Sequence, residues 1–484
     1  MSEVKIPNKK GLQIIKKANN KKDRDNTMQD ENIQNFKNTD QINENLTKEN
    51  TKEQNYTIGY KVITFIGKID DKSPSSNYTI SKNIKIPNLT LKGGAFLNMT
   101  TCLIENLKDK NTDFVFFATK GVKESCENLL SNLKDNQKKI EDFDENKLDD
   151  LFLRLTQIVK DTRDKNIIID ITHGFRDTAF VSLLSGLMQY SFNGANHINF
   201  IYAKMMGGDN FQIVSLDNYS NTMRLSFALT TFSQNLKVIY FDDIKDKFYI
   251  ALKNLSNSLF ENKLQAIKEN YLRLKKEKEK IETNKQSPLY PLLPMINDIF
   301  NELKEFEEFN FEKAKYNNKI KITSYANDFF ILAKLFLNKS YSLNAAGFIL
   351  EGLQYGFYLH FVDDDLDLKH YFKTQASGMT IRNLYEGYNE IKSDEKVAEF
   401  IKIIFNTRDG IADIRNSMSH CDPIFNHAKI PETINNLLEK TKKIFTEDDG
   451  LDKLSQYKKV INSQIKANIQ IIKNKQKSNW KKSK

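Results

Sequence analysis

The segment "DGIADIRNSMSHCDP", residues 409–423, places Arg415, Asn416 and His420 close together in the chain. Histidine titrates near neutral pH and can move protons. Arginine stays charged and can hold two phosphate oxygens at once. These groups suit RNA cleavage, because RNA carries its own nucleophile, the 2′-hydroxyl, beside the scissile phosphate. A protein then needs only to position that hydroxyl, move protons and stabilise the developing charge on the phosphate.

The spacing of these residues favours a helix end. On an ideal helix Arg415 and His420 lie about 140° apart around the axis, whereas Asn416 and His420 share one face. Pro423 disfavours helix at Asp422, so we expect His420 in the final turn. Arg415 must then reach around the helix, or the helix must be distorted. The pattern also fits an ordinary surface arginine and histidine, and by itself it does not decide.

A second segment, "NIIIDITHGFRDTAF" at residues 166–180, places a histidine after a run of β-branched residues. Asp170 ends the apolar run, and Thr172, His173 and Gly174 form the turn that follows. In an open parallel sheet, ligands bind outside the carboxyl ends of the strands. Gly174 allows close approach of the backbone to a ligand, and the next helix directs free N–H groups to the same place, which suits a phosphate.

Three further residues are candidates for the same crevice. Arg176 lies in the first helical turn, where a cation is unfavourable for the helix but useful if an anion binds. Gly67 and Thr119 end two other apolar runs and should open onto the crevice. A tight turn whose histidine caps the helix or packs is an equally open interpretation. The segment after Gly67 lacks GxGxxG, which argues against a nicotinamide cofactor.

The elements that must position these residues follow from hydrophobic patterning. Four apolar runs with strand character, separated by segments of helical spacing such as 122–133, occur between residues 57 and 235: "YKVITFIG", "TDFVFFATKG", "NIIIDITHG" and "HINFIYAKMMGG". Near-continuous apolar strands between helices indicate a parallel sheet covered on both faces. We therefore expect a Rossmann-like α/β domain at 57–235.

The rest of the chain reads as helical. Residues 236–320 are expected to form a helical connector, interrupted by a cluster of prolines at Pro288, Pro291 and Pro294. Residues 321–484 are expected to form an all-helical domain. Residues 1–56 are polar and cannot bury enough apolar surface to offset chain entropy, so we expect them to be disordered. The fold class is α/β followed by all-α.

Composition narrows the class of protein further. The chain has 484 residues and a formal charge of +10, and residues 453–484 carry ten lysines without an acidic residue. This basic C-terminal tail either solubilises the protein or contacts nucleic-acid phosphates. Cys102, Cys126 and Cys421 are odd in number and form no CxxC pair, which argues against a disulfide framework and a zinc site. With neither a signal peptide nor a membrane span in evidence, we expect a cytoplasmic protein without membrane contact.

The two motifs together carry a resemblance to a known family. "DITHGFR" resembles the DxTHG signature of a CRISPR-associated family whose N-terminal domain is of the CARF type, a Rossmann fold, and the similarity extends over residues 57–235. The helical domain with its R-N-x3-H motif resembles a HEPN ribonuclease domain. The order of the two matches the CARF–HEPN ribonucleases of type III CRISPR systems.

This resemblance implies a ligand-gated enzyme of antiviral defence. The first domain should form a homodimer, or a higher oligomer of dimers, and bind a cyclic oligoadenylate, with cyclic tetra-adenylate expected and no other cofactor. Thr172, His173 and Gly174 should contact this activator, and Arg176, Gly67 and Thr119 are further candidates.

The same resemblance makes Arg415 and His420 the catalytic pair, supported by Asn416. The expected reaction is cleavage of single-stranded RNA without metal, leaving a 2′,3′-cyclic phosphate and a 5′-hydroxyl. Two alternatives stay open. The protein could be a sensor or scaffold that binds without cutting, or the crevice could act as a ring nuclease that degrades the messenger.

Overall fold

A computed structural model gives the fold of the chain. The residues that it describes are 59–67, 74–123, 129–162, 165–173, 176–193, 198–241, 244–309, 322–362, 370–420, 427–446 and 449–482. Residues 1–56, for which the sequence predicts disorder, lie outside this set, as do Gly174, Cys126 and Cys421. From Gly59 onward the chain folds as one compact unit.

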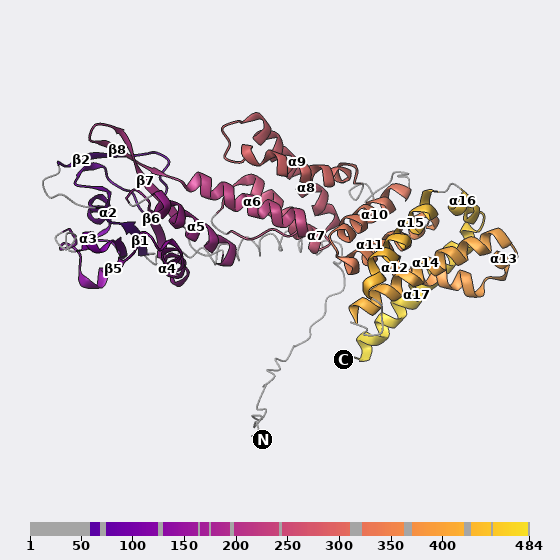
Figure 1. Cartoon of the computed structure of the whole chain (residues 1–484). Coiled ribbons are helices and arrows are strands. Elements are labelled where there is room, and N and C mark those ends of the chain that lie inside the picture. The colour runs from indigo at the N-terminus through magenta and orange to yellow at the C-terminus, as the bar shows by residue number, and fades with distance from the viewer. Residues whose placement is uncertain are drawn as a thin grey trace, which may run out of the picture. The chain divides into compact units, whose positions relative to one another are not determined.

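One mixed sheet occupies the first part of this unit (Figure 1). Its strands in the described ranges are β1 (Gly59–Phe65), β2 (Ser76–Ile80), β3 (Gly94–Phe96), β4 (Thr112–Ala118), β5 (Lys138–Asp142), β6 (Lys165–Asp170), β7 (Ile198–Gly207) and β8 (Asn210–Ser215). Their order across the sheet is β3-β2-β8-β7-β6-β1-β4-β5. Strands β7, β6, β1, β4 and β5 run parallel, whereas β8 is antiparallel to β7 and β3 to β2.

The Rossmann-like fold class predicted from the sequence is confirmed, with a mixed rather than purely parallel sheet. The four apolar runs form the central strands β7, β6, β1 and β4. Sequence analysis missed β2, β3, β5 and β8. Strand β5, with the sequence "KKIED", lies at the sheet edge, and its residues are half-buried or exposed. An edge strand of this kind needs no continuous apolar run, which is the pattern by which the sequence indicated the central strands.

Both faces of the central strands are buried, because alternate side chains enter different cores. Ile63 and Phe65 of β1 join one apolar cluster with α4 (Leu148–Asp161) and α5 (Arg176–Asn193). Val62 joins the other cluster with α2 (Met99–Leu107). This two-sided burial explains the near-continuous apolar strands.

The helix expected over residues 122–133 does not extend to residue 133, and residues 124–128 lie outside the described set. Helix α3 spans only Lys120–Lys123, and residues 129–133 form turns. Leu130 and Leu133 are buried, and the backbone N–H of Leu133 donates to the carbonyl of Leu130 at 3.1 Å. Two leucines three positions apart are buried here by a single turn, so this apolar spacing does not require a helix.

Helices make up the described chain beyond the sheet, as predicted. Their bounds are α6 (Asp217–Asn235), α7 (Lys247–Phe260), α8 (Leu264–Thr283), α9 (Leu293–Glu302), α10 (Ile322–Asn338), α11 (Ser342–Phe361), α12 (His370–Gly387), α13 (Asn389–Lys392), α14 (Glu395–Ser419), α15 (Ile430–Thr446), α16 (Asp449–Ser455) and α17 (Lys458–Lys482). The proline cluster lies between α8 and α9, with Pro291 in a short 3₁₀ turn at Tyr290–Leu292 and Pro294 in the first turn of α9. None of the helices in the described ranges combines the length and apolarity that crossing a membrane requires.

One apolar cluster runs without interruption from the sheet face under α4 and α5 through α6–α9 to the last helices. The segment expected to connect two domains therefore contributes to the same core as its neighbours. A shared core resists independent movement of its parts, since interiors are packed as densely as organic crystals.

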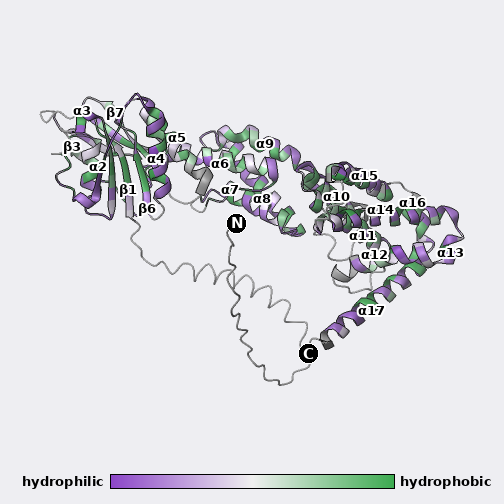
Figure 2. Cartoon of the chain, turned by 60° about the horizontal axis from the view of Figure 1, so that its bottom comes forward, coloured by the Kyte–Doolittle hydropathy of each residue, from purple (hydrophilic) through white to green (hydrophobic). Residues whose placement is uncertain are grey.

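The basic C-terminal segment is not a free tail, which corrects the sequence-based expectation. Residues 458–482 form α17, and Figure 2 shows hydrophilic and hydrophobic residues alternating along it. Ile461, Ile465 and Ile469 are buried at helical spacing, and α17 packs against α12. The lysines occupy the remaining faces, so the high charge concealed an amphipathic pattern.

Replacing Ile465 tests this role of α17. Ile465 is fully buried, so Ile465→Ala should lower the free energy of unfolding by roughly 2–5 kcal/mol through lost burial and a cavity. Ile471→Ala is the matched control, because Ile471 lies on the same helix and is 43% exposed. Urea denaturation of the full chain measures both. Equal stability of the two variants would show that α17 does not contribute to the core.

Candidate functional site

The turn after β6 is built around a fully buried carboxylate, Asp170. The Thr64 hydroxyl on the neighbouring strand β1 donates to Asp170 Oδ2 at 2.7 Å. Thr172 donates to Asp170 Oδ1 through its backbone N–H at 2.9 Å and through its hydroxyl at 2.5 Å. The Thr172 hydroxyl also accepts the backbone N–H of Ala203 on β7 at 2.9 Å. These bonds join three adjacent strands at their carboxyl ends.

Thr172 therefore has a structural role that the sequence did not reveal. Its hydroxyl donates to Asp170 and accepts from Ala203 within the protein. Asp170 was identified from sequence only as the end of the strand, although the register of β6 against β1 places it beside Thr64. The D-x-T spacing, typical of side chains that bond their own backbone two residues on, is the signal that could have revealed this bond.

Burial controls the protonation of this cluster. Desolvation raises the pKa of Asp170, while the charge of His173 and the hydrogen bonds from Thr172 and Thr64 act against that rise. Burial also raises the pKa of Cys102 to about 12, with a further contribution from Asp170. Burial, Cys102 and Asp170 together raise the pKa of Tyr78 to about 12. Tyr78 and Cys102 thus stay protonated and neutral at physiological pH.

His173 and Gly67 lie close together after the ends of β6 and β1. A Cβ atom added to Gly67 would lie 3.7 Å from His173 Nδ1, which is an ordinary contact distance. His173 is half-buried, and its Nε2 is buried without a hydrogen-bond partner among the residues that the structure describes. A buried polar atom without a partner is uncommon and marks a place where a ligand group can bind.

The other candidates are placed less decisively. Arg176 begins α5, is exposed, and makes no hydrogen bond or ion pair within the described ranges. Its guanidinium is therefore available beside the helix N-terminus, where an anion is favoured. Thr119 follows β4, and its carbonyl accepts the N–H groups of Val122 and Lys123. No contact joins Thr119 to His173 in the described part of the chain, and Gly174 lies outside that part.

The second site lies at the end of α14, as the sequence predicted. The helix ends at Ser419, and His420 is its C-terminal cap, with its N–H donating to the Asn416 carbonyl at 2.9 Å. Arg415 is half-buried, and its Nη2 donates to Asn416 Oδ1 at 3.1 Å. Asn416 and His420 are exposed. Asn416 thus orients Arg415, while the His420 side chain is left open to a substrate.

One residue outside the sequence motif, Glu351, lies within electrostatic range of Arg415. Glu351 lies half-buried on α11, which packs against α14. Burial raises the pKa of Glu351, and the charge of Arg415 acts against that rise. No sequence signal pointed to this glutamate, because it lies 64 positions before Arg415. Arg415 thus has an amide bonded to its guanidinium and an acidic side chain within the range of its charge.

The end of α14 carries a small set of polar groups. No hydrogen bond or ion pair joins Arg415 to His420 across the described residues. In the same ranges no group of three or more His, Cys, Asp or Glu side chains gathers as a metal site requires. The described site therefore offers one guanidinium, one amide and one imidazole, which can bind a phosphate and move a proton.

Comparisons with known proteins find similarity among solved structures. No protein-family model matches the chain, and no curated protein matches it. Among solved structures, the chain is similar to Csm6 of Enterococcus italicus bound to cyclic hexa-2'-fluoro-hexa-dAMP. The identity is 11%, the likeness covers 84% of this chain and 99% of that chain, and the TM-score is 0.36.

The bonds of Thr172 generate a stability prediction. Thr172→Val keeps the shape of the side chain but leaves the Ala203 N–H without its acceptor and removes one donor from Asp170. We expect the free energy of unfolding to fall by about 1–3 kcal/mol. Thr119→Val is the control, because the Thr119 hydroxyl has no hydrogen bond to another described residue. Chemical denaturation decides, and an unchanged stability of Thr172→Val would contradict the structural role.

Proposed function

We propose that this protein is a cyclic-oligoadenylate-activated endoribonuclease that cuts single-stranded RNA without metal, in the manner of CARF–HEPN proteins of type III CRISPR defence. The observation that carries the proposal is the exposed end of α14. There the Asn416 side chain accepts a hydrogen bond from Arg415, and an exposed His420 caps the helix five positions later. The Rossmann-like sheet that precedes this domain in the chain, with His173 and Arg176 after β6, supports the ligand gating.

The chemistry assigns one role to each group. A histidine takes the proton of the 2′-hydroxyl, whose oxygen attacks the adjacent phosphorus. The bond from phosphorus to the 5′-oxygen breaks, and that oxygen receives a proton. The products are a 2′,3′-cyclic phosphate and a 5′-hydroxyl. Arg415 stabilises the charge that develops on the phosphate oxygens, and Asn416 keeps the guanidinium in place.

The two proton transfers support a dimeric site. One transfer needs a base and the other an acid, and each chain supplies a single imidazole at the end of α14. A second copy of the chain, placed so that two α14 ends face each other, supplies the other histidine. One histidine can then be neutral and act as the base, while the histidine of the other copy is protonated and acts as the acid.

The activator is proposed to bind at the crevice of the sheet. A cyclic oligoadenylate offers phosphates and adenine rings. The N-terminus of α5 and the exposed Arg176 favour a phosphate, and the partnerless His173 Nε2 can bond to a phosphate or ribose oxygen. Cyclic tetra-adenylate is the proposed ligand.

An exposed apolar stripe beside the crevice supports dimerisation. Phe180, Leu184 and Met188 lie on successive turns of α5 and are 62%, 40% and 36% exposed. Leu153 of α4, which packs against α5, is 67% exposed. Contiguous exposed apolar side chains indicate an interaction surface, and α5 begins at the crevice. The proposed occupant of this stripe is the same stripe of a second copy.

A cleavage assay tests the nuclease proposal. A fluorescent single-stranded RNA is incubated with the full chain in EDTA, with cyclic tetra-adenylate, cyclic hexa-adenylate or no ligand. We expect cutting that depends on one ligand and a roughly 10²–10⁴-fold loss of rate in His420→Ala, as removal of a general acid or base produces. His360→Gln is the control. His360 lies on α11, its Nε2 is 3.3 Å from the Ser455 hydroxyl oxygen, and it is not part of this site.

The opposite outcomes are equally informative. A ligand that binds while no condition produces cutting would favour a sensor or scaffold. Loss of intact ligand in the reaction would favour a ring nuclease in the crevice. Equal cutting by His420→Ala and wild type would remove His420 from the mechanism.

A charge placed in the apolar stripe tests the dimer. Phe180→Glu should weaken dimerisation by about thirtyfold or more, the effect of losing a hot-spot residue worth at least about 2 kcal/mol. Sedimentation across a range of concentrations measures the dissociation constant. Ile250→Glu on α7 is the control, since Ile250 is 41% exposed and lies outside the stripe. A dimer that is equally stable in both variants would exclude the stripe as its interface.

A further inference from the structure

Helix α6 is attached at its start to the strand that borders the ligand crevice. The Asp217 carboxylate, in the first turn of α6, accepts the Asn199 side-chain amide at 2.6 Å and the Phe200 backbone N–H at 3.3 Å. Both partners lie on β7, whose Ala203 donates to the Thr172 hydroxyl. A displacement of the turn after β6 therefore reaches the start of α6 through hydrogen bonds.

The other end of α6 is held by the helical part of the chain. Lys339 Nζ, at the end of α10, donates to the Ser233 carbonyl in the last turn of α6 and forms an ion pair with Glu302 of α9 at 2.7 Å. The Tyr341 hydroxyl donates to the Asn235 carbonyl at 3.0 Å. A cation is favoured at a helix C-terminus, and Lys339 satisfies carbonyls that the helix itself leaves without a partner.

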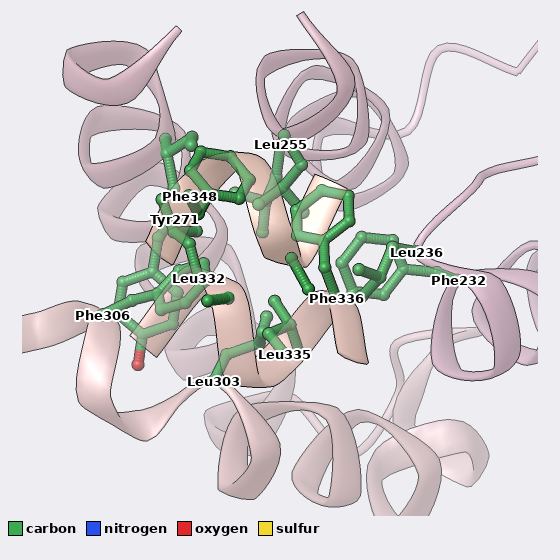
Figure 3. Close-up of a cluster of buried hydrophobic side chains, with 14 of the residues drawn as sticks. Phe232, Leu236, Leu255, Tyr271, Leu303, Phe306, Leu332, Leu335, Phe336 and Phe348 are labelled. Atoms are coloured by element: carbon green, nitrogen blue, oxygen red, sulfur yellow. The ribbon is translucent and has the colours of Figure 1, made fainter. Parts of the chain in front are cut away.

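The ion pair between Lys339 and Glu302 is strengthened because Lys339 is largely buried. The Lys339 side chain is 14% exposed, so its ion pair is poorly screened by solvent. Apolar side chains from α6, the connector helices and α10–α11 pack together beside it (Figure 3). Those that Figure 3 labels are Phe232, Leu236, Leu255, Tyr271, Leu303, Phe306, Leu332, Leu335, Phe336 and Phe348. The end of α6 and the α10–α11 turn thus form one packed block.

Helix α11 connects this block to the candidate nuclease site. It begins at Ser342, directly after Tyr341, and carries Glu351 three turns later. Gly352 permits close packing of α11 on α10, since a Cβ atom there would lie 2.7 Å from the Phe330 ring. Helix α11 therefore follows any movement of the α10–α11 turn. Because α11 packs against α14, which carries Arg415, such a movement also reaches the guanidinium.

We propose that Lys339 and Tyr341 are positioning residues that couple the ligand crevice to Arg415 through α6. The inference rests on the proposed function and adds the regulation of that same site. Helix α6 is about 28 Å long and is bonded at both ends, so it transmits a displacement instead of absorbing it. A bound ligand then favours one position of α11 only to the extent that it binds that state more tightly.

Three substitutions in the full chain separate coupling from folding. Lys339→Met keeps the apolar stem and removes the charge, the bond to Ser233 and the ion pair with Glu302. Tyr341→Phe removes only the bond to Asn235 and keeps the ring, which packs 5.3 Å from the Phe260 ring. Lys334→Met is the matched control, because Lys334 lies on α10, shortly before Lys339, but bonds Asn435 of α15 at 2.9 Å.

Three measurements are made on each variant with cyclic tetra-adenylate and cyclic hexa-adenylate. Calorimetry gives ligand affinity, the RNA assay gives the ratio of cutting with and without ligand, and hydrogen exchange reports on residues 337–345. We expect Lys339→Met to match wild type in its ligand affinity and in its basal rate of RNA cutting, measured without ligand. Its stimulation by ligand should fall by about fivefold or more, the range of typical coupling. Tyr341→Phe should show a smaller loss and Lys334→Met none.

Each outcome identifies what has failed. Wild-type stimulation in Lys339→Met, with the same ligand-induced change of exchange at 337–345, would overturn the coupling alone. If wild type binds ligand without cutting RNA, but its exchange at 337–345 responds to ligand and that of Lys339→Met does not, the coupling holds and the nuclease proposal fails. If wild type binds neither ligand, the proposed gating fails and the coupling fails with it.

Discussion

The buried Asp170 carboxylate is the constraint on which the crevice depends. Placing a carboxylate in a protein interior is unfavourable unless its oxygens are hydrogen-bonded, and here both oxygens are, by Thr64 and Thr172. These bonds fix the end of β6 against β1 and, through Thr172, against β7. The chain must therefore turn immediately after Asp170. That turn brings His173 against Gly67 and precedes the start of α5, so the placement of His173 follows from one buried carboxyl group.

A similar principle operates at the end of α14. Arg415 is half-buried with the Asn416 amide beside it and the charge of Glu351 opposite. A guanidinium held in this way loses less conformational freedom when it meets a phosphate than one that is free to move. His420, in contrast, is exposed and caps the helix. The two residues that the motif joins in sequence therefore have different environments, one oriented by the protein and one open to substrate.

The two sites are linked by structure that neither motif contains. Helix α6 is bonded to β7 at its start and to the α10–α11 turn at its end, and a single apolar cluster surrounds that turn. A packed interior shifts between discrete arrangements more readily than it deforms continuously. The residues of this joint, Lys339 and Tyr341, are an ordinary lysine and tyrosine by sequence. Their roles arise only from the carbonyls of Ser233 and Asn235 that they meet.

The sequence by itself determined the fold class, the four central strands and the end of α14 at His420, because hydrophobic periodicity and proline are local signals. It did not determine β5 and β8, whose edge and half-exposed positions require no apolar run, and its lysine content concealed the buried face of α17. The sequence likewise did not reveal the roles of Thr64, Glu351 and Lys339. Each acts on a partner between 64 and 106 positions away in the chain. Only the tertiary structure brings such residues together, since hydrogen bonds and charges act over distances in space and not along the sequence.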